Sequence, residues 1–179
     1  MRTERALVWF RNDLRLHDHE PLQLAGRAAA HHGGEVVPVY CFDPRHFSTL
    51  RQTGLRKTGV HRARFLLESV AGLRASLRGI GSDLVILCGQ PEEMLPHLFH
   101  AEGRTTILAH REAMPEELGV EDGVRGACAA LQRGDDVVLD AAYCGDTLCA
   151  RASLSSRPLS FPALSFSVVD AARHISFAA

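Results

Sequence analysis

Short apolar runs alternate with longer segments of helical periodicity along most of this chain. The apolar runs are rich in β-branched and aromatic residues, which is typical of buried strands. Strands that are separated by helices form parallel βαβ units with right-handed crossovers. The pattern therefore predicts the α/β class, with a three-layer, doubly wound, Rossmann-like fold around a five-stranded parallel sheet. The predicted strands are residues 7–10, 36–42, 84–88, 106–109 and 137–139.

The longest predicted helix covers residues 58–78, with Thr58 as its N-cap and Gly79 after its last turn. Five apolar residues within it and just beyond it recur at the spacing of one helical face, which predicts packing against a sheet. The other predicted helices are residues 21–31, 92–100 and 115–132, and each begins at or next to a proline. The residues of the apolar stripe are Leu66, Val70, Leu73, Leu77 and Ile80.

Charged side chains follow two of the predicted strands. Arg11, Asn12 and Asp13 come directly after the first strand, and residues 110–117 after the fourth strand contain three glutamates. In a doubly wound sheet, ligands bind at the carboxyl ends of the strands, in the crevice where the strand order reverses. We therefore expect the two charged loops to converge on one crevice.

Two interpretations of these charges stay open. The arginines of the first loop fit a solvated loop in which they pair with nearby acids. The glutamates near Pro115 stand at a helix start, where acids complement the helix dipole, and the sequence by itself favours this interpretation. A carboxylate in a crevice could instead accept paired N–H bonds from a heterocycle such as a pteridine.

Composition and the absence of targeting signals limit the cellular compartments that we expect for this protein. The formal net charge of −1 provides no strong attraction to nucleic acid or to a membrane surface. Apolar runs fall far short of the ~20 residues that a membrane span needs. The first residues contain neither an apolar signal core nor an Arg/Ser-rich presequence. With five cysteines that form no C-x-x-C pair, these features predict a reducing, cytoplasmic or nuclear location.

The motifs of several common sites are missing from the sequence. Neither a P-loop string nor a G-x-S-x-G nucleophile elbow occurs. The Gly79-Ile80-Gly81 string precedes a predicted strand instead of following one, so we interpret it as a helix stop. His97 and His100 lack the further ligands that a zinc site needs, and no metal site is predicted.

Several short strings together resemble a known family. They are WFRNDLR at 9–15, YCFDPRHF at 40–47, KTG at 57–59, HRARFL at 61–66 and GQPEE at 89–93, followed by the glutamate-rich residues 112–121. In this order they resemble the N-terminal α/β domain of the photolyase/cryptochrome family, and most closely that of the DASH cryptochromes. The resemblance extends from about residue 7 to residue 148.

The resemblance implies the strand order 3-2-1-4-5 and a set of cofactor-binding residues. Glu116 matches the carboxylate that holds the pterin of methenyltetrahydrofolate, the antenna cofactor of DASH relatives. The other candidates lie in the same loop or across the crevice from it. They are Glu117, Glu112, Arg11, Asn12 and Asp13.

Full-length relatives are flavoproteins whose α/β domain packs on a larger helical domain that holds FAD. They use blue light to repair cyclobutane pyrimidine dimers, in the DASH branch preferentially in single-stranded DNA, or for light signalling. The resemblance divides this chain into an α/β domain at 1–148 and a divergent, poorly ordered tail at 149–179, without the flavin domain. We therefore expect no catalytic residue here, weak folate binding, weak or no DNA binding, and a protein partner at the exposed interdomain face.

Some positions depart from the family pattern. Asp18-His19 stands where relatives usually have Asp-Asn, and Cys144 and Cys149 replace a tryptophan and a tyrosine. Trp9 is the only tryptophan, so the chain cannot build a tryptophan electron-transfer chain.

Two other functions remain open. One is a stand-alone adenine-nucleotide-binding signalling module, against which the missing Gly-rich phosphate loop counts, and the other is a non-catalytic isoform that binds other proteins.

Overall fold

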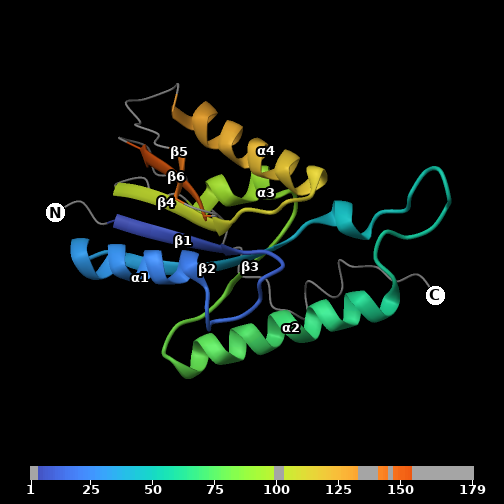
Figure 1. Cartoon of the computed structure of the whole chain (residues 1–179), viewed down its shortest axis with the longest axis horizontal. Helices are drawn as coiled ribbons and strands as arrows, with labels where there is room; N and C mark the ends of the chain where they lie inside the picture. The colour runs from blue at the N-terminus through green and yellow to red at the C-terminus, as the bar shows by residue number, and fades with distance from the viewer. Residues whose placement is uncertain (1–3, 99–102, 133–140, 145–146, 155–179) are drawn as a thin grey trace.

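The computed structural model describes residues 4–98, 103–132, 141–144 and 147–154. Within these ranges the strands form one six-stranded sheet in the order β3-β2-β1-β4-β6-β5 (Figure 1). No helix of the described part combines the length and the apolar character that a membrane span requires. The strands are β1 Glu4–Phe10, β2 Glu35–Phe42, β3 Val85–Cys88, β4 Gly103–His110, β5 Ala141–Cys144 and β6 Thr147–Leu154.

Four neighbouring strands confirm the predicted α/β class. β1 pairs in parallel with β2 on one side and with β4 on the other, and β2 pairs in parallel with β3. The order β3-β2-β1-β4 agrees with the first four strands of the predicted order. The predicted fifth strand, 137–139, lies outside the described residues.

The strand that lies next to β4 is antiparallel. β6 pairs with β4 from Gly103↔Leu154 to His110↔Thr147, and β5 pairs antiparallel with β6. Antiparallel strands need only a short connection, whereas a parallel neighbour needs a long crossover. Apolar patterning indicates that a strand exists but not its direction, so this arrangement was not predicted. β6 also crosses residue 148, where the sequence analysis placed the domain boundary, and 155–179 lie outside the described residues.

The helices cover both faces of the sheet, as a three-layer fold requires. On one face, α1 (Glu20–His32) and α2 (Val60–Gly79) pack on Ala6, Val8 and Phe10 of β1. On the other face, α4 (Pro115–Gln132) packs on Leu7 and Trp9. Because successive strand residues point to opposite faces, β1 contributes to both cores and is buried between them (Figure 1). Short elements complete the fold: η1 (Pro44–Phe47), α3 (Pro91–Met94) and η2 (Leu95–Leu98).

Helix α2 differs from its prediction at its N-cap and at one residue of its apolar stripe. Its N-cap is Gly59, because the hydroxyl of Thr58 is turned away and donates to the carbonyl of His46 at 2.7 Å. At the other end the helix stops at Gly79, so Ile80 leaves the helical face and is 70% exposed. The stripe is otherwise confirmed by three fully buried residues and one that packs partly against the same core. These are Val70, Leu73 and Leu77, with Leu66 partly buried.

The exposure of Ile80 leads to a prediction. Ile80→Lys should change the free energy of unfolding by no more than about 0.5 kcal/mol, as surface substitutions usually do. Urea unfolding followed by circular dichroism measures this difference. A loss of more than about 1 kcal/mol would mean that this side chain is covered in solution.

Candidate functional site

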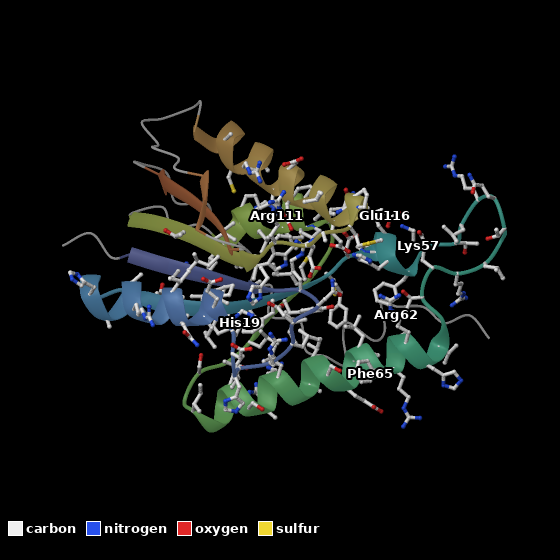
Figure 2. The ribbon with its side chains drawn as sticks, in the orientation of Figure 1. His19, Lys57, Arg62, Phe65, Arg111 and Glu116 are labelled. Atoms are coloured by element: carbon white, nitrogen blue, oxygen red, sulfur yellow. The ribbon has the colours of Figure 1, made fainter. Side chains whose placement is uncertain are left out.

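The two charged loops do meet, at the carboxyl ends of β1 and β4. The chain leaves β1 toward α1 on one face of the sheet and leaves β4 toward α4 on the other, which opens a crevice between them. Beside this crevice is a cavity of about 220 Å³. Its walls come from the ends of β1 and β2, from η1, from the first half of α2 and from the start of α4. Arg62 and Phe65 of α2 are two of the lining residues (Figure 2).

Arg11 is a buried cation that joins β1 to helix α4. One guanidinium nitrogen donates to Oε1 of Glu121, and another donates to Oε2 of Glu117. The guanidinium carbon lies 4.7 Å from the centre of the Trp9 ring. The planar fork of arginine suits such a pair of carboxylates, and Glu121 is 0% exposed. Arg11 therefore pairs with acids, as one of the two open interpretations held, but it does so in the interior.

Asn12 and Glu112 connect the two loops directly. Nδ2 of Asn12 donates to Oε1 of Glu112 at 3.0 Å. The backbone N–H of Glu112 donates to Oε1 of Glu121 at 2.9 Å. Glu112 is partly buried, and its hydrogen bond with Asn12 orients its carboxylate at the crevice edge.

The two glutamates at the start of α4 have different surroundings. Glu117 faces inward to Arg11, and Nε2 of His46 lies 3.8 Å from its other oxygen. The Glu116 side chain is 74% exposed on the rim, where Nζ of Lys57 lies 2.9 Å from its Oε2 (Figure 2). The hydrogen bond and the charge of Lys57 lower the pKa of the Glu116 carboxyl below its ordinary value. Of the three predicted glutamates, Glu116 is thus the most exposed.

Asp13 is shared by two histidines that the sequence analysis did not assign to the site. Its Oδ1 accepts the backbone N–H of Arg11 at 2.9 Å. Its Oδ2 lies 2.8 Å from Nε2 of His19 and also contacts Nδ1 of His110. Burial by itself would raise the pKa of Asp13, but the hydrogen bonds from His19, Arg11 and His110 outweigh it and hold the pKa well below its usual range.

His19 also forms the N-cap of α1. Its Nδ1 accepts the backbone N–H of Leu22 at 3.2 Å, although the ring is 0% exposed. The departure from Asp-Asn at 18–19 was visible in the sequence, but only the folded chain shows that the ring reaches Asp13. For Glu121 a signal was available, because this acid shares a helical face with the buried Val124 and Cys128.

Asp13, His19 and His110 lie close enough together to suggest a metal site. The proton positions argue against that interpretation. Nδ1 of His19 accepts a hydrogen bond, so the hydrogen of the neutral ring is on Nε2. A protonated Nε2 has no lone pair for a metal, and this atom lies 2.8 Å from Oδ2 of Asp13. His97 lies on η2, and His100 lies outside the described residues.

Comparisons with known proteins agree on one family. The family model described as DNA photolyase matches residues 6–140. Cryptochrome DASH of Gloeobacter violaceus is 50% identical over 131 residues, which are 73% of this chain and 25% of that protein. Cryptochrome DASH of Xenopus laevis is 42% identical over 151 residues, 84% of this chain and 27% of that protein. This chain therefore spans about a quarter of the length of these relatives.

Solved structures agree with this result. The crystal structure of a Synechocystis cryptochrome matches with a TM-score of 0.66 and 41% identity, over 73% of this chain and 26% of that one. An archaeal photolyase from Sulfolobus tokodaii, whose structure contains two FAD molecules, matches with a TM-score of 0.54 and 24% identity, over 70% of this chain and 27% of that one. The second likeness supports the fold alone.

Proposed function

Because this chain belongs to the DNA photolyase family, we propose that it is the antenna-binding α/β part of a DASH-type cryptochrome. In this proposal the crevice between the β1 and β4 loops holds a folate-type chromophore, methenyltetrahydrofolate. The observation that carries the proposal is the contact of Asn12 with Glu112, because Asn12 also lines the cavity of about 220 Å³. Apolar walls with a few convergent polar groups are typical of cofactor sites.

Glu116 would hold the pterin, as the resemblance implies. A carboxylate that accepts two N–H bonds from the edge of a heterocycle makes a strong, oriented contact. Glu116 is open to a ligand, and its present partner Lys57 is a single flexible cation that a ligand can displace. Glu112 is the second choice, because its Oε1 already accepts from Asn12.

We assign no photochemistry to this chain by itself. In full-length relatives the flavin would carry the repair of pyrimidine dimers, and the protein would orient it. The part of the family represented here would supply the light-harvesting site. Contacts with DNA and with a flavin domain are proposals for the complete protein, and a cytoplasmic or nuclear location is likewise a proposal.

A titration tests the assignment. The purified chain is titrated with methenyltetrahydrofolate and followed by the absorbance of the chromophore. We expect Glu116→Gln to weaken binding about ten-fold, since a hydrogen bond to a charged group contributes about 1.5–3 kcal/mol. The control is Arg27→Ala, which removes an exposed arginine on α1 that makes no hydrogen bond or ion pair with the described residues.

Any other outcome of this titration would change the proposal. Unchanged binding by Glu116→Gln together with weakened binding by Glu112→Gln would move the pterin contact to Glu112. Binding of FAD in preference to folate would replace the folate by a flavin antenna. Absence of binding to either ligand would overturn the antenna function for this chain.

A further inference from the structure

Asp13 connects three segments that are far apart in the sequence. It follows β1, while His19 begins α1 and His110 ends β4. Both imidazoles reach the same carboxylate oxygen, one at 2.8 Å from Nε2 of His19 and the other through Nδ1 of His110. The two rings are 4.8 Å apart between centroids. The carboxylate thereby ties the β1 loop to the β4 loop across the crevice.

His19 fills two roles that a smaller side chain cannot combine. Its Nδ1 caps α1, and its Nε2 on the far side of the ring lies 2.8 Å from Oδ2 of Asp13. The carbonyl oxygen of an asparagine could take the place of Nδ1, but asparagine has no atom at the place of Nε2. The amide nitrogen of a glutamine could take the place of Nε2 but would leave the helix uncapped. The histidine at this position is thus a distinctive feature of the chain.

The residues next to this cluster are those of the proposed antenna site. Asn12 precedes Asp13, and Glu112 is two residues after His110. A hydrogen bond of 3.0 Å joins Asn12 to Glu112, so a shift of either loop separates them. Binding sites need their contact groups held to within roughly 0.5 Å, which is the work of the residues behind them.

We propose that His19 and His110 are positioning residues, which hold Asp13 so that the β1 and β4 loops keep the crevice in its binding geometry. The part that concerns the ligand rests on the proposed antenna function. The part that concerns the two loops does not, because it is a statement about contacts within the chain.

Two backbone N–H groups report directly on this geometry. The N–H of Arg11 donates to Asp13, and the N–H of Glu112 donates to Glu121. We would measure hydrogen exchange at these two amides and at the core amides of Leu7 and Ile107. His110→Phe should speed exchange about ten-fold or more at Arg11 and Glu112, because a hydrogen bond to a buried charge is lost. The core amides should keep their rates.

Conservative variants separate positioning from a general loss of structure. His110→Asn places an amide nitrogen where Nδ1 was and should restore slow exchange at Arg11 and Glu112. His19→Gln should protect these amides better than His19→Asn, although only asparagine preserves the cap of α1. If His110→Phe does not fold, the comparison of His19→Gln with His19→Asn tests the positioning role instead. Unchanged exchange in His110→Phe, or no difference between the two His19 variants, would overturn the proposal.

Binding of the ligand by the same variants is measured separately. Methenyltetrahydrofolate should bind about ten-fold more weakly to His110→Phe and normally to His110→Asn and Arg27→Ala. If exchange behaves as expected but no variant and no parent chain binds folate, the antenna function fails and the positioning role stands. If folate binds equally to all variants while exchange differs, the loops are coupled but the coupling does not serve this ligand.

Discussion

Arg11→Ala is expected to lower the free energy of unfolding by about 3–5 kcal/mol, since it leaves buried carboxylates without their cation. Glu121 is fully buried, the side chain of Glu117 is 16% exposed, and the guanidinium of Arg11 contacts both. Oε2 of Glu121 already lacks a hydrogen-bond partner among the described residues. Removal of Arg11 would leave both carboxylates without its positive charge. Single domains have only about 5–15 kcal/mol of stability, so the change would remove a large fraction.

Urea unfolding at neutral pH measures this effect. Arg27→Ala serves as the control and should stay within about 0.5 kcal/mol of the parent chain. Arg11→Lys should recover only part of the loss, because one ammonium group cannot contact two carboxylates with the geometry of the guanidinium fork. A loss below about 1 kcal/mol for Arg11→Ala would mean that water reaches Glu117 and Glu121 in solution.

Asp13→Ala is expected to cost about 3 kcal/mol at neutral pH, because it removes the carboxylate that contacts both imidazoles and accepts the N–H of Arg11. Thermal unfolding should show a decrease in Tm of the order of 10 °C. The matched control is Asp83→Ala. The pKa of Asp83 is also lowered, by hydrogen bonds from Arg74 and Arg78, but its side chain is 48% exposed. Its loss should cost no more than about 1 kcal/mol.

The stabilisation by Asp13 should also depend on pH in a defined direction. Its pKa is lower in the folded protein than in the unfolded chain, where an aspartate has a pKa of about 3.9. The contribution is therefore complete above about pH 4 and is lost as the pH falls below that value toward the lower folded-state pKa. The difference in unfolding free energy between the parent chain and Asp13→Asn should be smaller at pH 3 than at pH 5. A larger difference at pH 3 than at pH 5 would contradict the assigned hydrogen bonds.

The fold was predictable as far as it depends on local patterns. Strand β1 lies between two helix layers, and its near-continuous apolar run indicated this. The ends of α2 were less predictable, since the choice between Thr58 and Gly59 as N-cap depends on whether the Thr58 hydroxyl finds another partner. Ile80 was assigned to the buried stripe from its spacing alone, although Gly79 was expected to end the helix before it.

The position of the candidate site could be predicted from the sequence, but the roles of its individual residues could not. Parallel strands bring their carboxyl ends to one edge, so the meeting of Asn12 with Glu112 followed from the topology. Nothing local distinguishes a glutamate that faces solvent, such as Glu116, from one that faces a buried arginine, such as Glu117. The two residues are adjacent in the chain, and only the direction of α4 decides which one turns inward.

The sequence by itself determined the family, the α/β class and the end of the sheet at which charged groups gather, because strings, periodicity and strand ends are properties of neighbouring residues. The tertiary structure alone decided the partners: Arg11 with Glu121, and Asp13 with His19 and His110. Arg11 and Glu121 are 110 residues apart, and Asp13 and His110 are 97 apart. Such contacts arise only when the sheet brings β1 and β4 side by side, because a hydrogen bond depends on positions of about 3 Å in space and not on separation along the chain.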